Sequence, residues 1–158
     1  MYKNVLVPID KTKLSEIAID EALNVIDLSD PKSKIILLNI IEIYPITRKD
    51  KEIEEKNITN KTQKYIQPIK KKLEKKVPNI EIAIRSGRNP ADEICKYANS
   101  FNVDVVVIAS RGMSGFMQWT LGSYTEKIIK NCTKPILIKT CPGVSREPYL
   151  QIDELPGL

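Results

Sequence analysis

Many of the apolar residues of this chain fall into five short, nearly unbroken runs. The runs cover residues 5–9, 34–41, 80–85, 103–109 and 135–140. They are shorter than typical helices and rich in Val and Ile, a pattern typical of strands that are buried on both faces of a parallel sheet. The run at 80–85 differs, because its isoleucines alternate with Glu81, Ala83 and Arg85. Alternation predicts that this strand lies nearer an edge of the sheet.

Between the runs, apolar residues recur every three or four positions, which predicts amphipathic helices. The predicted helices cover residues 15–26, about 58–77, 90–101 and a segment that starts at 123. Pro68 lies inside the second of these and predicts a kink or a late start. The polar, charged stretch 45–57 that precedes it predicts a mobile loop.

Polar residues mark the expected helix starts. Thr12 or Ser15 is expected to cap the first helix, and Asn89 the third, with Pro90 at its first position. Ser123 is expected to cap the last helix and to form a capping box with the glutamate three residues later.

Strand and helix therefore alternate along the chain, which predicts an α/β fold. Residues 1–140 are expected to form a single doubly wound domain, a parallel sheet with helices on both faces. The segment 141–158 contains prolines and glycines without a period and is expected to be extended or disordered. Ligands of such sheets bind outside the carboxyl ends of the strands. Asp10 follows the first strand there, and a glycine-rich loop follows the fourth.

The glycine-rich loop contains Gly112, Gly115 and Gly122 and leads into Ser123. The order buried strand, glycine-rich loop and helix start favours an anion, because free backbone N–H groups and the positive end of a helix dipole point into one space. The alternative is that the glycines only make turns and the apolar residues between them cover the core. Neither the Walker lysine pattern nor Gly-x-Gly-x-x-Gly is present.

Composition excludes several kinds of chemistry. The chain of 158 residues has 42% apolar and 28% charged residues and no apolar run long enough to span a bilayer. A first strand begins near the N-terminus, so no signal peptide, no membrane partner and a cytoplasmic location are expected. The absence of histidine excludes Ser-His-Asp and Cys-His catalysis, and no metal site is expected from protein side chains alone. The three cysteines are expected to be reduced.

The net charge of +5 is concentrated in one segment. Residues 48–76 carry 11 basic and 5 acidic side chains, a local charge of +6, so the remainder carries −1. Such a segment could contact nucleic acid or an anionic membrane. Tyr65 is the only aromatic residue within it, and the stacking residues of a single-strand binder are missing. A solvated helix face is the favoured interpretation, and nucleic acid is not an expected partner.

Several segments of this sequence together form a recognisable pattern. They are Asn4-Val5-Leu6-Val7-Pro8-Ile9-Asp10, Leu37-Leu38-Asn39-Ile40-Ile41, Ser86-Gly87-Arg88-Asn89-Pro90-Ala91-Asp92-Glu93-Ile94, Ala109-Ser110-Arg111-Gly112, Leu121-Gly122-Ser123 and Lys134-Pro135-Ile136-Leu137-Ile138. In these segments the chain resembles the universal stress protein family. The ATP-binding branch of the family carries Gly-x2-Gly-x9-Gly-Ser/Thr. Gly112, Gly122 and Ser123 match the second half of that pattern, and Ala109 stands in place of its first glycine.

The resemblance implies a five-stranded sheet of order 3-2-1-4-5, an adenine nucleotide alpha hydrolase-like fold. It also implies a homodimer that pairs its fifth strands, residues 135–140, and ATP as the ligand, with or without Mg²⁺ or Mn²⁺. The implied binding residues are Pro8, Ile9, Asp10, Ile40, Ala109, Arg111, Gly112, Gly115, Gly122, Ser123, Tyr124 and Thr125. Pro8, Ile9 and Ile40 would line the adenine slot, Asp10 would accept hydrogen bonds from the ribose, and the others would flank the ribose and phosphates.

Three functions are compatible with this resemblance. The first is an ATP-binding regulatory protein of the stress response. The second is a dimeric interaction module of the same fold without a nucleotide, because the methyl group of Ala109 closes the pocket. The third is a slow ATPase, which the sequence supports least, since no general base or arginine finger is evident. Asp10 likewise has an alternative role as the turn or cap residue of the helix that follows it.

Overall fold

The computed structural model describes residues 1–43, 48–111 and 122–141, and only the backbone of 48–55 within them. Its elements are β1 (Asn4–Pro8), α1 (Lys13–Val25), β2 (Lys34–Glu42), α2 (Arg48–Leu73), β3 (Asn79–Gly87), α3 (Pro90–Ser100), β4 (Val105–Ser110), α4 (Ser123–Asn131) and β5 (Ile136–Thr140). The predicted runs of apolar residues all become strands. Of the predicted tail 141–158, all but Cys141 lies outside the described residues.

The five strands form one parallel sheet of order β3-β2-β1-β4-β5, as predicted. The strand with alternating residues, β3, is one edge of the sheet, and β5 is the other. Pro8 is the last residue of β1, where its missing N–H interrupts no further ladder bond. The chain order reverses between β1 and β4, so the switch point lies at the carboxyl ends of these two strands.

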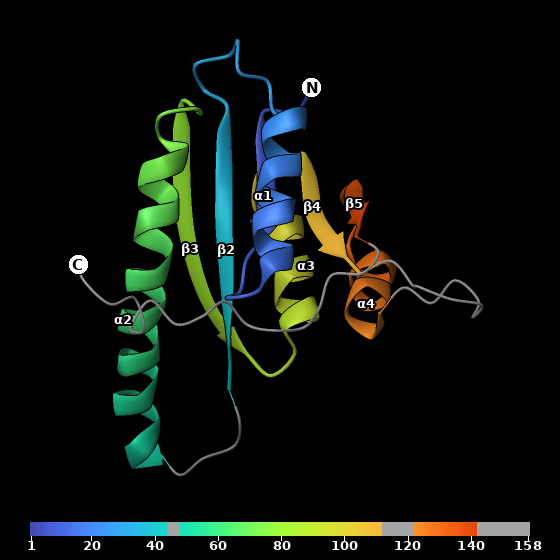
Figure 1. Cartoon of the computed structure of the whole chain (residues 1–158). Helices are drawn as coiled ribbons and strands as arrows, with labels where there is room; N and C mark the ends of the chain where they lie inside the picture. Colours follow the sequence, from blue (N-terminus) through green and yellow to red (C-terminus); the bar gives the residue numbers. More distant parts are fainter. Residues whose placement is uncertain (44–47, 112–121, 142–158) are drawn as a thin grey trace.

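Helices cover both faces of the sheet, as the doubly wound fold requires (Figure 1). Alternate residues of each central strand point to opposite faces. Val5 and Val7 of β1 pack in one core with α1 and α2, whereas Leu6 packs in a second core with α3 and α4. Because the central strands are apolar on both sides, each face buries its own core, which accounts for their unbroken apolar sequence.

The second helix begins earlier than the sequence pattern predicts. Residues 45–57 were expected to form a loop, but α2 begins at Arg48 and continues to Leu73 without interruption at Pro68. Residues 45–47 lie outside the described residues. The prediction that the helix starts late, at Pro68, is therefore wrong. The apolar stripe that signals a helix begins only at Ile58, so the first turns lack the pattern on which the prediction depends. Their residues are mostly Lys and Glu, which are good helix formers.

One helix start differs from the prediction, and two others have the expected cap residue without a capping hydrogen bond. Ser123 is the first residue of α4 and Gly122 occupies the cap position, so the predicted capping box is absent. Thr12 is the cap residue of α1 and Asn89 that of α3, as expected, but neither side chain makes a capping hydrogen bond. The Thr12 hydroxyl donates to Asp10 Oδ1 instead (2.5 Å).

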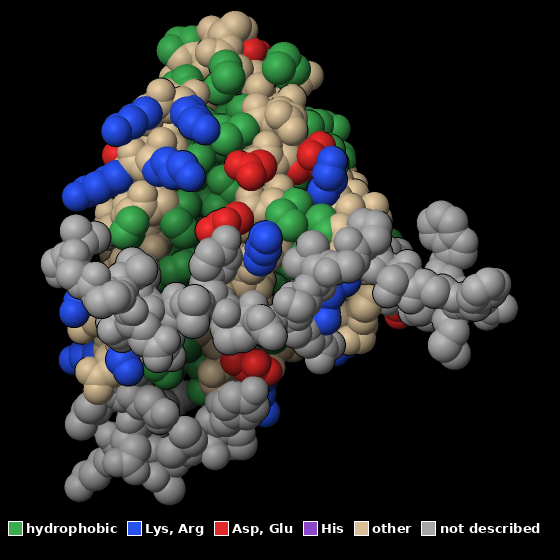
Figure 2. Space-filling model, viewed as in Figure 1, with side chains coloured by type: hydrophobic (Ala, Val, Ile, Leu, Met, Phe, Trp, Pro, Cys, Tyr) green, Lys and Arg blue, Asp and Glu red, His purple; other side chains and the backbone are tan. Residues whose placement is uncertain are grey.

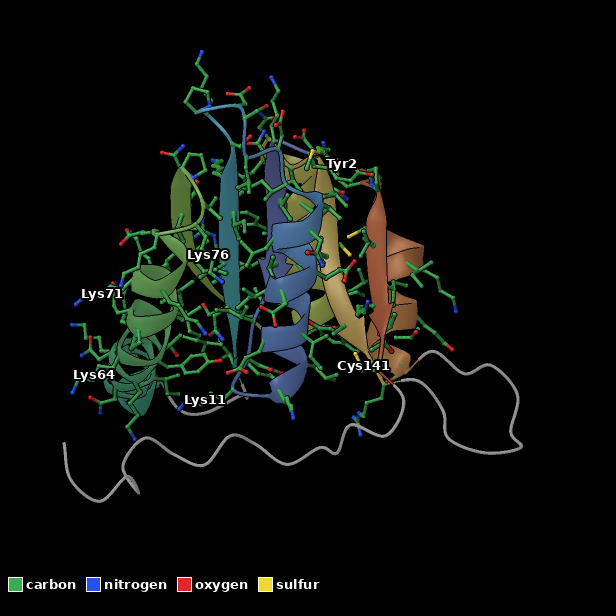
Figure 3. All side chains as sticks on the ribbon, turned by 45° about the horizontal axis from the view of Figure 1, so that its top comes forward. Tyr2, Lys11, Lys64, Lys71, Lys76 and Cys141 are labelled. Atoms are coloured by element: carbon green, nitrogen blue, oxygen red, sulfur yellow. The ribbon has the colours of Figure 1, made fainter. Side chains whose placement is uncertain are left out.

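The lysines of α2 form an exposed face. Figure 2 shows Lys and Arg side chains gathered at the left of the molecule, over the end of this helix, and Lys64 and Lys71 point away from the sheet in Figure 3. The opposite side of the helix contributes Ile66 and Leu73 to the core. The predicted solvated basic face is therefore present. None of the helices in the described part of the chain is long and apolar enough to cross a membrane.

Candidate functional site

A cavity of about 620 Å³ opens at the carboxyl ends of β1, β2 and β4. This volume is in the usual range for a small-molecule site. The starts of α1, α3 and α4 also reach it, through Ser15, Pro90 and Ser123. The positive ends of three helix dipoles therefore converge on the cavity, an arrangement that favours an anionic ligand.

The predicted site residues that the structure describes all line this one cavity. They are Pro8, Ile9, Asp10, Ile40, Ala109, Arg111, Gly122, Ser123, Tyr124 and Thr125. The remaining two, Gly112 and Gly115, lie outside the described residues. The fold thus brings together residues from opposite ends of the chain because β1 and β4 are neighbours in the sheet.

The sequence patterns do not identify the other lining residues. These are Thr12, Leu14, Ser15, Ala18, Leu38, Glu42, Pro90, Ile94, Ile108 and Ser110. Two of them carried a usable signal: Glu42 is the last residue of β2 and Ser110 is the last residue of β4. Side chains at the carboxyl ends of parallel strands are the first candidates for ligand contact in this fold.

The two oxygens of the Asp10 carboxylate have different surroundings. Oδ1 accepts hydrogen bonds from the Thr12 N–H (2.9 Å), the Thr12 hydroxyl (2.5 Å) and the Ser15 hydroxyl (2.7 Å). The Asp10 N–H in turn donates to Ser15 Oγ (2.8 Å). Among the described residues, no backbone N–H or side chain donates a hydrogen bond to Oδ2. Asp10 is therefore both the turn residue before α1 and an acceptor with one oxygen available to a ligand.

Buried hydroxyl groups form part of the cavity wall. The buried polar side chains of the described residues are Ser15, Ser33, Thr62, Ser110 and Thr125. Three of these five, Ser15, Ser110 and Thr125, line the cavity. Thr125 Oγ1 donates to Ser110 Oγ over 3.5 Å, a weak contact that leaves both hydroxyls able to bond elsewhere. Buried hydroxyls with incomplete hydrogen bonding are suited to contact a polar ligand.

Gly122 leaves open space at the start of α4. Its backbone is extended (φ −53°, ψ 150°), a conformation that any residue can adopt. A Cβ placed on Gly122 would meet no atom of the described residues within 4 Å. Gly87 differs, because a Cβ there would overlap the side chain of Glu93. Contacts within the described residues therefore do not require a glycine at position 122.

The charged groups of the described wall are Asp10, Glu42 and Arg111. Tyr124 adds a phenol, whose pKa is raised by desolvation and then by the charge of Asp10. Tyr124 is 43% exposed as a residue. The phenol stays neutral and can donate a hydrogen bond. No cluster of acidic residues and cysteines that could hold a metal occurs among the described residues.

The comparison with protein families gives one match that spans most of the chain. The family model described as the Universal stress protein family matches residues 1–139. Universal stress protein MJ0577 of Methanocaldococcus jannaschii is 29% identical over 154 residues, covering 87% of this chain and 94% of that protein. Universal stress protein MJ0531 of the same organism is 25% identical over 146 residues, covering 90% of this chain and 84% of that protein.

Solved structures share the fold over a similar length. The structure of MJ0577 has 29% sequence identity and a TM-score of 0.69, and the match covers 89% of this chain and 97% of that one. A universal stress protein family protein from Arabidopsis thaliana, At3g01520, was solved with AMP bound; it has 17% identity, a TM-score of 0.63 and coverage of 87% and 91%. A universal stress protein in complex with cAMP has 22% identity, a TM-score of 0.56 and coverage of 87% and 96%.

Proposed function

The chain belongs to the universal stress protein family, and from this premise we propose that it binds an adenine nucleotide, ATP foremost, in the cavity between β1 and β4. One observation carries the proposal. The described residues implied by the family's motif come from both halves of the chain and line a single cavity. Relatives of the same fold with bound AMP and cAMP add support.

The cavity offers a suitable group for each part of a nucleotide. The apolar side chains of Ile9 and Ile40 would enclose the base. Asp10 Oδ2 would accept hydrogen bonds from ribose hydroxyls, because Oδ1 is already occupied by Thr12 and Ser15. The negative phosphates would lie at the positive end of α4.

The phosphate end of the site would draw on both backbone and side chains. The N–H groups that begin α4, the hydroxyls of Ser123 and Thr125 and the guanidinium of Arg111 are the available donors. Gly112 and Gly115 belong to the same proposed subsite by their place in the family motif. A divalent cation, Mg²⁺ or Mn²⁺, would be held mainly by the phosphates, since the described residues provide no metal cluster.

The role that follows is that of a nucleotide-responsive regulatory protein of the stress response, acting as a homodimer through β5. The support for the dimer is the position of β5 at the edge of the sheet, with Ile136, Leu137 and Ile138 only partly buried. The second candidate is a dimeric module without a nucleotide. The observation that favours it is the methyl group of Ala109 in the cavity wall, at the position where the family pattern has glycine.

Calorimetric titration separates these two candidates. The purified chain is titrated with ATP, ADP, AMP and cAMP, with GTP as the control for base recognition, in the presence and absence of Mg²⁺. Saturable heat with adenine nucleotides and none with GTP supports the first candidate. The absence of heat with every nucleotide, together with saturable ATP binding by an Ala109→Gly variant, supports the second and assigns the loss of binding to that methyl group.

A further inference from the structure

Two cysteines from separate elements meet between α3 and α4. Cys95 lies in the middle of α3, and Cys132 is the C-cap residue that follows α4. Both are free thiols, and their sulfur atoms are 2.7 Å apart. A disulfide bond has a length of about 2.05 Å, so the two sulfurs need to approach by only about 0.7 Å to form one.

The surrounding contacts hold the two segments in this position. On one side of the cysteine pair, the Asn131 side chain donates to Asp92 Oδ1 (3.0 Å). On the other side, both the N–H and the hydroxyl of Thr133 donate to Asn99 Oδ1 (3.1 and 2.8 Å). Residues immediately before and after Cys132 are therefore fixed to the turns of α3 that flank Cys95. The cysteines meet within a docked interface and not at the ends of loose loops.

The two thiols are not equivalent. Cys95 is 3% exposed, and desolvation raises its pKa to about 12. Cys132 is only half-buried; desolvation raises its pKa too, but a hydrogen bond with Cys95 acts in the opposite direction. Cys132 is therefore the thiol that loses its proton first and that solvent-borne reagents reach first. Cys95 is the thiol held in contact with it.

We propose that Cys95 and Cys132 form a reversible disulfide site, which closes when the chain meets a small-molecule disulfide such as oxidised glutathione. The Cys132 thiolate attacks one sulfur of the reagent, forms a mixed disulfide and expels one molecule of thiolate. Cys95 then loses its proton and attacks the Cys132 sulfur, which breaks the mixed disulfide and expels the second thiolate. Two protein thiols are oxidised, and one reagent disulfide is reduced to two thiols.

The cross-link would constrain the part of the chain that supplies one wall of the cavity. The sequence between the two cysteines contains Ser110, Arg111 and the segment 122–125, which line the site described above. Closing a chain segment of this length restricts the unfolded state, and a disulfide of this kind is expected to raise the melting temperature by about 5–15 °C.

Cys141 provides an internal control. It is buried beyond the end of β5, its thiol donates to the Lys139 carbonyl (3.6 Å), and among the described cysteines neither of the others is paired with it. A Cys141→Ser variant should therefore retain the reaction. Cys95→Ser and Cys132→Ser variants keep the side-chain size and should each abolish it.

The experiment uses the full chain, first reduced and then equilibrated with defined ratios of reduced to oxidised glutathione. Remaining thiols are alkylated in denaturant, and the products are identified by intact mass and by peptide mapping without reductant. In the wild type, alkylation should fall from three thiols to one, the 95–132 peptide pair should appear, and reductant should reverse both. Melting temperature measured with and without oxidant should rise in the wild type and Cys141→Ser but in neither single variant of the pair.

A stable mixed disulfide on Cys132 without closure would overturn the proposal, and so would a disulfide that involves Cys141. Persistence of three alkylatable thiols at all ratios, while the melting curve shows a folded protein, would also overturn it. If a serine variant fails to fold, the wild-type peptide map alone decides the outcome. None of these measurements involves a nucleotide, so the result is independent of the proposed function.

Discussion

Asp10 and Ser15 exchange two hydrogen bonds across the start of α1. The Asp10 N–H donates to Ser15 Oγ (2.8 Å), and the Ser15 hydroxyl donates to Asp10 Oδ1 (2.7 Å). This pair fixes the carboxylate relative to the helix. Among the described residues, no group donates a hydrogen bond to the other carboxylate oxygen, Oδ2. One side chain thus serves both the turn that precedes α1 and the cavity, and the two roles can be separated by substitution.

Asp10→Asn is expected to weaken ATP binding while the fold persists. The amide oxygen can still accept the hydrogen bonds of Thr12 and Ser15, whereas the NH₂ group cannot accept a bond from a ribose hydroxyl. A hydrogen bond to a charged group contributes about 1.5–3 kcal/mol, which corresponds to roughly a tenfold to hundredfold loss of affinity. Calorimetric titration of wild type and variant with ATP and 2′-deoxy-ATP measures this loss of affinity.

The comparison variant is Asp10→Ala, which removes both roles. It should lower the unfolding free energy by about 1 kcal/mol as well, because the turn loses its acceptor. For both variants the loss should be smaller with 2′-deoxy-ATP, since one hydroxyl is already missing. Equal losses for the two nucleotides would assign Asp10 to the turn alone.

Gly122→Val is expected to reduce nucleotide affinity at least tenfold with little change in stability. A Cβ at this position meets no atom of the described residues within 4 Å, so the valine side chain is expected to project into space that the phosphates would occupy. The backbone at this position suits any residue, and loss of a glycine cap costs less than about 1 kcal/mol. Calorimetry and urea denaturation of the same variant measure the two effects.

Gly87→Ala is the matched control. Its Cβ overlaps the Glu93 side chain, so this variant should lose stability and keep its affinity. A Gly122→Val protein with unchanged affinity would remove the start of α4 from the site.

The five strands were accessible from the sequence for a physical reason. Runs such as Val5–Val7 and Val105–Val107 are buried on both faces, and that burial is what makes them continuous in sequence. The early start of α2 was not accessible, because its first turns carry no apolar stripe. The contact between Cys95 and Cys132 was not either, because it depends on how α3 and α4 pack side by side and no local pattern encodes such packing.

Glu81→Gln is expected to lower stability at neutral pH and to have little effect in acid. Glu81 accepts hydrogen bonds from Lys34 Nζ (2.6 Å) and the Tyr97 hydroxyl (3.1 Å), and the bond from Lys34 is the main cause that lowers its pKa. A lowered folded-state pKa adds stability that is present above the unfolded value of 4.5 and is lost as pH falls through the folded value.

The side chain of Glu81 is 43% exposed, so solvent screens the pair and the difference at neutral pH should stay below about 1 kcal/mol. Urea denaturation of wild type and variant from neutral pH to well below pH 4.5 gives the difference at each pH. When both proteins also carry Lys34→Met, the difference in unfolding free energy should be smaller and should depend less on pH. A difference that grows towards acid would contradict this account of the ion pair.

Ile138→Lys is expected to convert the proposed dimer to a monomer. β5 has β4 as its sole neighbour in the described sheet, so its outer edge presents backbone N–H and C=O groups that a second chain can pair with. A twofold axis would bring two such edges together antiparallel and would bury Ile138 at the contact. A lysine there would place a charge in the interface, and one from each chain would repel the other. Light scattering should give about twice 17.9 kDa for the wild type and a mass near 17.9 kDa for the variant.

The opposite edge of the same sheet supplies the control for this prediction. Ile82 of β3 is also a partly buried isoleucine on an edge strand, so Ile82→Lys should cost comparable stability and leave the mass unchanged. Ile138 packs in part against the core shared with α3 and α4, so thermal melts of both variants must show a cooperative transition before the masses are compared. A wild type that is monomeric at micromolar concentration, or dissociation caused equally by both substitutions, would exclude β5 as the specific interface. Retention of the dimer by Ile138→Lys and its loss in Ile82→Lys would move the interface to β3.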